Sequence, residues 1–90
     1  MPETVKLIVE GKVQGVFYRQ STREKAVALG LTGTVKNLPD GHVEIIATGT
    51  AEQLQQLKQW CNLGPPRAVV TKVSSTPLPL QPFKNFLIIR

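Results

Sequence analysis

Apolar and polar residues alternate in two short stretches of the chain, and this pattern predicts two half-buried β-strands. The first stretch covers residues 4–10 and the second covers residues 42–48. The apolar residues on their inward faces are Val5, Leu7, Val9, Val43, Ile45 and Ala47. Residues 31–37 are rich in Thr and Val and predict a further strand. The turn residues Pro39 and Gly41 then join this strand to the second stretch as a hairpin.

Two other stretches carry apolar residues at helical spacing. The apolar face of the first helix comprises Tyr18, Thr22, Ala26 and Leu29, and that of the second comprises Leu54, Leu57 and Cys61. Gly30 follows the first stripe and is a suitable residue to end a helix. Thr50 and Gln53 have the spacing of a capping box at the start of the second helix. The Gly-Pro-Pro sequence at residues 64–66 ends it.

The C-terminal part of the chain predicts two strands joined by an arm. Residues 69–73 are rich in valine and predict a fourth strand. Residues 76–82 contain too many prolines for a central strand or a helix, so we expect an extended arm there. Residues 86–89 are apolar and predict a short strand at an edge of the sheet.

These elements follow the order β-α-β-β-α-β with a short strand at the C-terminus. That order is the ferredoxin-like α+β sandwich, in which an antiparallel sheet carries two helices on one face. A helix that connects two strands of one sheet makes them parallel, so residues 4–10 and 31–37 run in the same direction. The loop after the first strand and the hairpin after the second therefore share one end of the sheet. Arg19 and Asn37 are expected to face one small ligand at that end.

Length, charge and cysteine content narrow the class of protein. The chain has 90 residues, the length of one small domain, so we expect a single domain over residues 1–90. Its formal net charge of +5 favours anionic partners. Cys61 is the one cysteine, so no internal disulfide calls for an oxidising compartment. The chain shows neither a signal peptide pattern nor an apolar stretch long enough for a bilayer. We expect a cytoplasmic monomer without a membrane partner.

The loop between the first strand and the first helix has the composition of an anion-binding loop. It contains Gly11 and Gly15 and leads to Arg19 on the first helical turn. Backbone N–H groups are accessible where Gly15 has no side chain, and the start of the helix adds unpartnered donors and the positive end of its dipole. The planar fork of an arginine matches the geometry of phosphate. The loop therefore predicts a phosphate site.

Two segments of the sequence resemble the signatures of a known family. Residues 11–19, GKVQGVFYR, match the first signature of the acylphosphatase family throughout. Residues 33–43, GTVKNLPDGHV, with Gly49 after them, resemble its second signature. One departure is Thr34, which stands where the family usually has an aromatic residue, while Asn37 stays in register. The chain is therefore identified as a member of this family over essentially its whole length.

The resemblance implies an enzyme that hydrolyses small acyl phosphates to a carboxylate and inorganic phosphate, with no metal and no cofactor. It implies that Arg19 and a set of backbone N–H groups hold the phosphoryl oxygens, and that Asn37 orients the attacking water. The residues that supply these N–H groups are Gln14, Gly15, Val16, Phe17 and Tyr18. A carboxylate leaving group needs little help from a general acid, and the sequence offers no carboxylate pair or His–Cys cluster at ligand spacing.

The competing function is a basic ferredoxin-like module that binds nucleic acid or a ligand without catalysis. RNA-binding domains of this fold class need exposed aromatic residues on their central strands, and this chain has none there, so we expect no nucleic-acid partner. Other candidate residues have simpler interpretations. We expect His42 and Arg23 to be solvated, and Cys61 to be a small core residue. Trp60 is expected to cover the sheet or the arm.

Overall fold

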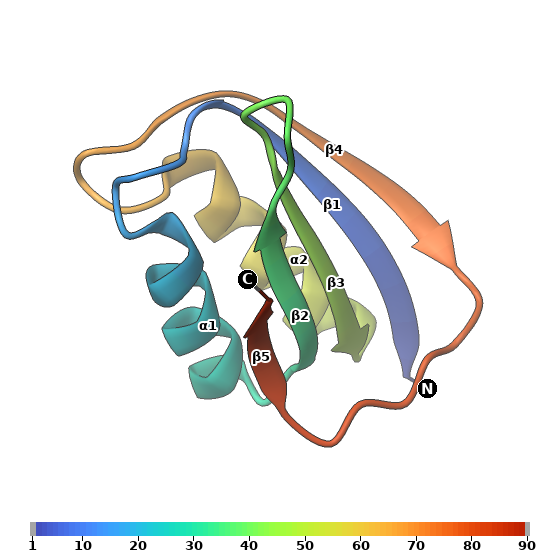
Figure 1. Cartoon of the computed structure of the whole chain (residues 1–90). Coiled ribbons are helices and arrows are strands. Elements are labelled where there is room, and N and C mark those ends of the chain that lie inside the picture. The colour runs from blue at the N-terminus through green and yellow to red at the C-terminus, as the bar shows by residue number, and fades with distance from the viewer. Residues whose placement is uncertain (1, 90) are drawn as a thin grey trace.

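Five strands lie side by side in the order β4-β1-β3-β2-β5 (Figure 1). They are β1 (Glu3–Lys12), β2 (Thr32–Asn37), β3 (Val43–Gly49), β4 (Val69–Leu78) and β5 (Phe86–Ile89). The helices α1 (Tyr18–Leu29) and α2 (Ala51–Leu63) cover one face of the sheet (Figure 1). These bounds come from a computed structural model, which describes residues 2–89. The ferredoxin-like α+β fold expected from the sequence is confirmed.

The strand directions explain where the site lies. β3 pairs in the antiparallel sense with both β1 and β2, so β1 and β2 run in the same direction. β4 is antiparallel to β1 and completes an antiparallel sheet of four strands. β5 adds to this sheet in parallel with β2, which makes the whole sheet mixed. The parallel pairing arises because β4 ends beside the start of β1, and the arm that follows brings the chain to the start of β2.

The fourth strand is longer than the sequence predicts. We expected a strand over residues 69–73 and an arm over residues 76–82, but β4 continues to Leu78 and places Pro77 opposite Val5. The physical reason is that β4 lies at an edge of the sheet, where a proline can remain in a strand because one of its two sides needs no ladder hydrogen bond. The predicted edge position of β5 is confirmed at the opposite side.

The core lies between the sheet and the two helices. Val9, Val43 and Ile45 are fully buried on the inner face, as their alternation predicts. The buried residues of α1 are Tyr18, Thr22 and Ala26, and those of α2 are Leu54, Leu57 and Cys61. The capping box at the start of α2 and the left-handed Gly30 at the end of α1 are also confirmed. Within residues 2–89, neither helix has the length and apolar character needed to cross a membrane.

Three hydroxyl-mediated hydrogen bonds hold the arm that leads to β5. Thr48 Oγ1 donates to the carbonyl of Gln81 at 2.7 Å, and the N–H of Gln81 donates to Thr4 Oγ1 at 2.9 Å. The two threonine hydroxyls lie 2.6 Å apart. A hydroxyl has one proton, so Thr4 must be the donor in this pair, because the Thr48 proton is already used. Both threonines are buried, and the arm is therefore fixed to the start of β1 and the end of β3.

Gly33 in β2 provides a test of this packing. Its φ of +148° is unfavourable for other residues, and a Cβ there would collide with the carbonyl of Ile46 on β3. We expect Gly33→Ala to lower the free energy of unfolding by about 2–4 kcal/mol. Gly41, with φ +94° and open space around it, is the matched control, and Gly41→Ala should cost about 1 kcal/mol. Urea unfolding measures both, and equal losses would contradict the close approach of β2 to β3.

Candidate functional site

A groove of about 290 Å³ lies at the end of the sheet where β1 and β2 finish. Its lining residues are Val13, Gly15, Phe17, Tyr18, Arg19, Gln20, Asn37 and Ile88. Arg19 and Asn37 thus border one groove, as the strand directions predict. Three residues of the predicted N–H loop also line it, whereas Gln14 and Val16 do not. Ile88 of β5 also lines the groove, and no pattern in the sequence indicated that it would.

The loop between β1 and α1 is anchored on one side and open on the other. Val13 and Val16 are buried in the core, whereas Gly15 and Phe17 are exposed. Both exposed residues have positive φ, +74° for Gly15 and +61° for Phe17, and Phe17 is the one non-glycine residue with positive φ among residues 2–89. The pattern turns the backbone sharply before α1 and buries the side chains of Val13 and Val16, while that of Phe17 stays exposed. Gly15 and Phe17 of this loop both line the groove.

The start of α1 has a surplus of positive charge. The N-cap residue Phe17 makes no side-chain capping bond, and the first turn contains no acidic residue. The N–H of Ser21 donates to the Phe17 carbonyl at 3.0 Å, so the N–H groups of the residues just before Ser21 have no intrahelical acceptor. Arg19 adds a full charge to the positive end of the helix dipole, which is unfavourable without an anion nearby. This end of α1 is therefore suited to an anion.

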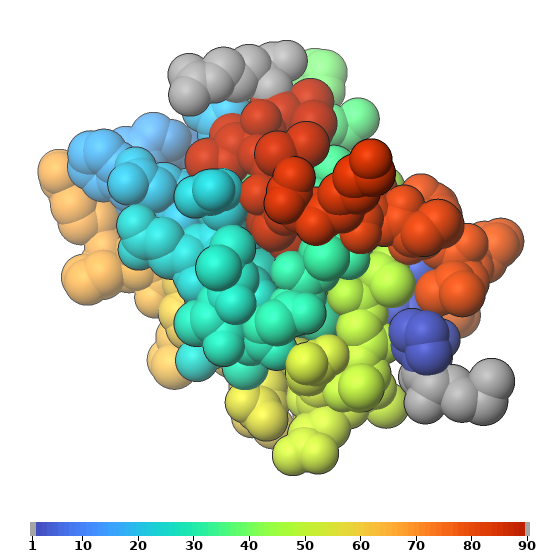
Figure 2. Space-filling view, turned by 90° about the horizontal axis from the view of Figure 1, so that it is seen from below, coloured from blue at the N-terminus to red at the C-terminus, as the bar shows by residue number. Residues whose placement is uncertain are grey.

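Two arginines of α1 contact the backbone of β5. Arg19 Nη1 donates to the carbonyl of Ile89 at 3.4 Å, and Arg23 Nε donates to the carbonyl of Phe86 at 3.1 Å. Figure 2 shows β5 beside α1 on this face of the molecule. Arg23 is exposed, as expected, but its hydrogen bond gives it a structural contact that the sequence did not predict. The guanidinium of Arg19 is thus held from the side by the last strand.

Asn37 is the last residue of β2 and lies opposite Val43 of β3. Its Oδ1 is buried and accepts no hydrogen bond from any residue in the range 2–89. A buried polar atom without a partner is costly, by about 1–3 kcal/mol, and in a native protein it calls for an explanation. Asn37 also lines the groove, so the residue that carries this unpartnered oxygen borders the space in which a small molecule would bind.

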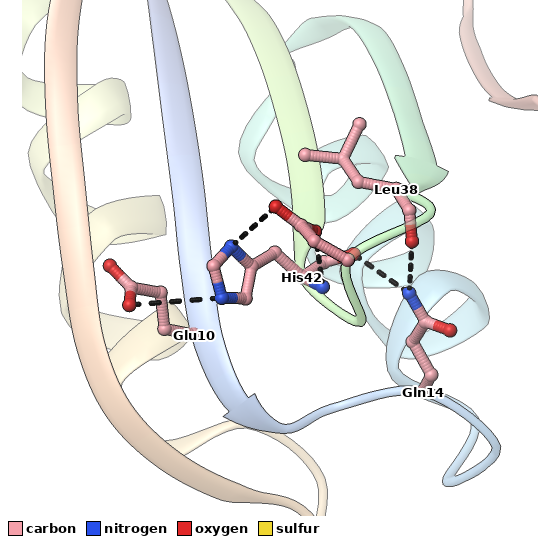
Figure 3. Close-up of polar contacts among 5 residues, drawn as sticks. Glu10, Gln14, Leu38 and His42 are labelled. Atoms are coloured by element: carbon pink, nitrogen blue, oxygen red, sulfur yellow. Dashed lines mark hydrogen bonds and ion pairs between the residues drawn. The ribbon is translucent and has the colours of Figure 1, made fainter.

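The side chain of Gln14 connects the loop to the β2–β3 hairpin (Figure 3). Its Nε2 donates to the carbonyl of Leu38 and to the carbonyl of His42, each at 2.9 Å. The sequence assigned only the backbone N–H of Gln14 to the site. No sequence signal identifies the two acceptors, because backbone carbonyls are present at every position and only the fold brings these two within reach.

His42 is half-buried rather than solvated. Its Nδ1 lies 3.2 Å from Asp40 Oδ2 and its Nε2 lies 3.7 Å from Glu10 Oε1 (Figure 3). The N–H of His42 also donates to Asp40 Oδ1 at 3.0 Å. These contacts join the hairpin to the end of β1 on the side away from the groove, whose lining does not include His42. Over residues 2–89, no three His, Cys, Asp or Glu side chains are grouped as a metal site would require.

Tyr18 anchors the start of α1 through its side chain. Its ring lies 5.6 Å from that of Trp60, tilted by 48°, and its hydroxyl donates to the carbonyl of Cys61 at 2.8 Å. Trp60 thus packs against the core beside Tyr18 of α1. Burial raises the pKa of the Tyr18 hydroxyl, and burial raises the pKa of the Cys61 thiol to about 12. Cys61 is fully buried, which confirms it as a core residue.

The fold and the groove together define a class of protein. It is a small ferredoxin-like α+β domain whose open end combines a glycine-containing backbone loop, an uncapped helix start, an arginine and an asparagine. Domains with this combination are suited to hold a small anion.

Comparisons with known proteins identify the family. The family model for Acylphosphatase matches residues 5–88. An acylphosphatase from Marinobacter nauticus is 58% identical over 81 residues, which cover 89% of this chain and 88% of the relative. The structure of an acylphosphatase from Coxiella burnetii has a TM-score of 0.95 at 40% identity, covering 98% of this chain and 93% of the other. The acylphosphatase structure from Bacillus subtilis also has a TM-score of 0.95, at 36% identity with full coverage of both chains (100%). The chain belongs to the acylphosphatase family and is an enzyme of that hydrolase class.

The buried thiol of Cys61 predicts a loss of stability in alkali. The pKa of the Cys61 thiol is near its ordinary value of 9.0 in the unfolded chain, and burial raises it to about 12 in the fold. The stability that the fold gains by keeping this thiol protonated is therefore complete below pH 9 and is lost as the pH rises toward 12. Because of Cys61, we expect the free energy of unfolding to be lower by about 2–3 kcal/mol at pH 11 than below pH 9. The buried Tyr18 hydroxyl adds to this loss in the same direction.

Urea unfolding between pH 8 and pH 11 measures this loss, and Cys61→Ala is the control. The variant has no thiol, so its stability should fall less steeply with pH than that of the unmodified chain, whatever the cost of the small cavity. Parallel curves for the two proteins would contradict the burial of a protonated thiol.

Proposed function

We propose that this acylphosphatase cleaves the carboxyl-phosphate mixed anhydride of small acyl phosphates by direct attack of one water on phosphorus. The phosphoryl oxygens are held by the backbone N–H groups of residues 14–18 and by Arg19, and Asn37 orients the water. The observation that carries the proposal is the groove that Arg19, Gly15 and Asn37 share, with the unpartnered Oδ1 of Asn37 beside it.

The charge distribution supports the binding of the phosphoryl group. The first turn of α1 offers N–H donors without a cap and without a nearby acidic side chain. Gly15 is exposed, and apart from its two chain neighbours no residue in the range 2–89 has an atom within 4 Å of the place where a Cβ would lie. Arg19 adds charge-assisted donors that match phosphate oxygens. These groups are fixed before the substrate arrives, so they stabilise the charge of the phosphoryl group in the transition state without reorganisation.

Asn37 suits the orientation of water rather than its deprotonation. A carboxamide accepts a hydrogen bond through its oxygen and has no basic group near neutral pH. The Oδ1 of Asn37, which has no hydrogen-bond partner among residues 2–89, accepts a hydrogen bond from the attacking water and so directs a lone pair of that water at phosphorus. The proton of that water passes to a phosphoryl oxygen of the substrate, or leaves late in the reaction.

The leaving group explains why so few side chains suffice. A carboxylate is a weak base, so it departs from phosphorus without a general acid, and positioning with electrostatic stabilisation accounts for the catalysis.

No metal, cofactor or nucleic acid takes part. The site uses residues of one chain, so we propose that the enzyme acts as a monomer. We also propose that it acts in the cytoplasm. Its shallow groove accepts varied acyl groups, and the inorganic phosphate product competes with the substrate.

The direct test is the hydrolysis of benzoyl phosphate in the presence of a chelator. We expect saturable turnover that the chelator does not reduce and that inorganic phosphate inhibits competitively. In NMR titrations, phosphate should shift the signals of Gly15, Arg19 and Asn37, because phosphate occupies the same loop. An absence of turnover, or signals that shift only on the strands with an oligonucleotide, would favour a binding module instead.

Two substitutions separate binding from catalysis. Arg19→Ala removes donors from both the bound substrate and the transition state, so kcat should fall by about 10²–10³ and the affinity for phosphate should weaken. Asn37→Ala removes the group that orients water, so kcat should fall while KM changes little. The matched controls are the exposed residues Arg67 and Asn62, whose Ala variants should keep normal turnover. A folded Arg19 or Asn37 variant with normal kcat would remove that residue from the mechanism.

A further inference from the structure

Gln14 uses both protons of its side-chain amide to connect the N–H loop with the β2–β3 turn. A carboxamide NH₂ carries two donors, and Nε2 of Gln14 directs them to the carbonyls of Leu38 and His42 at 2.9 Å each (Figure 3). The two carbonyls belong to the turn between β2 and β3, whereas Gln14 belongs to the loop after β1. This side chain therefore connects the loop after β1 with the turn that follows Asn37.

The hairpin turn is already closed without Gln14. The N–H of Leu38 donates to the carbonyl of His42 at 2.8 Å, and the N–H of Gly41 donates to the carbonyl of Leu38 at 3.1 Å. Each acceptor of Gln14 thus has a backbone donor of its own within the turn. Gln14 adds a second donor to each carbonyl and is not needed to form the turn. Its contact fixes where the turn lies relative to the loop.

The placement of Asn37 depends on this turn. Asn37 directly precedes Leu38, and its buried Oδ1 receives no hydrogen bond from the part of the chain that the structure describes. Its amide oxygen is therefore placed by the backbone at the end of β2. That backbone is in turn held to the N–H loop through Leu38 and Gln14.

We propose that Gln14 is a positioning residue, which sets the distance and direction from the N–H loop to the Asn37 amide. The inference rests on the proposed function, in which the loop holds the phosphoryl group and Asn37 orients the water. A water that attacks in line must be placed precisely relative to phosphorus, and a misplacement of about 1 Å can cost about 10²-fold in rate. Gln14 acts through Asn37 and does not touch the substrate with its side chain.

The expected signature is a loss of kcat with little change in binding. Gln14→Ala keeps the backbone N–H of residue 14 and the guanidinium of Arg19, so KM and the inhibition constant of phosphate should change less than about 3-fold. The turn is released from the loop, so kcat should fall by about 10- to 100-fold. Gln14→Glu keeps the length of the side chain but replaces the donors with a carboxylate, and its kcat should fall at least as far.

A double-mutant cycle with Asn37→Ala distinguishes positioning from a general structural role. Without the Asn37 amide there is nothing left to position, so Gln14→Ala should lower kcat by less than about 3-fold in that background. The experiment measures kcat and KM for benzoyl phosphate in the single and double variants. Gln59→Ala is the matched control, since Gln59 is an exposed glutamine on α2, and it should leave kcat unchanged. Urea unfolding checks that each variant folds, and the Glu variant serves if the Ala variant does not.

The outcomes separate this inference from the proposed function. Normal kcat in a folded Gln14→Ala or Gln14→Glu variant would overturn the positioning role. An equal loss of kcat on Gln14→Ala with and without Asn37 would overturn it as well, while the role of Asn37 would stand. Normal turnover in Asn37→Ala alone would remove Asn37 from the mechanism, and the positioning role of Gln14 would fall with it.

Discussion

The position of β3 between β1 and β2 is the constraint on which the site depends. Antiparallel pairing on both sides of β3 forces β1 and β2 to run in one direction, so the chain leaves both strands at the same end of the sheet. The register makes this specific, because Val9 of β1 and Asn37 of β2 both lie opposite Val43. The loop that begins after β1 therefore starts close to the level of Asn37.

Hydrogen bonds to backbone carbonyls hold the polar side chains of this end in place. Arg19 donates to β5, and Gln14 donates to the β2–β3 turn. β5 is in turn located by the arm, which Thr4 and Thr48 fix at the opposite end of the sheet. The site of this acylphosphatase is thus supported by contacts at both ends of the fold. Among residues 2–89, Asn37 Oδ1 has no hydrogen-bond partner and the start of α1 has no side-chain cap, and the proposed chemistry uses both.

The sequence predictions were correct for features that depend on neighbouring residues and incomplete for features that depend on residues far apart in the sequence. The inward residues of β1 and β3, the stripes of α1 and α2 and the capping box at Thr50 depend on neighbours within a few residues, and they were predicted correctly. The length of β4 and the parallel pairing of β5 were not predicted. Whether Pro77 can remain in a strand depends on its lying at an edge, and edges exist only once all strands are assembled.

The sequence by itself determined the order of elements, the family signatures and the placement of Arg19 and Asn37 at one end of the sheet. These are consequences of local periodicity, of turn residues and of the rule that a helical crossover joins parallel strands. Only the tertiary structure decided that Gln14 bridges the loop and the hairpin, that β5 supports Arg19, and that Asn37 Oδ1 finds no partner within residues 2–89. Each of these contacts involves a backbone group distant in sequence, and such groups look alike at every position until the fold brings them together.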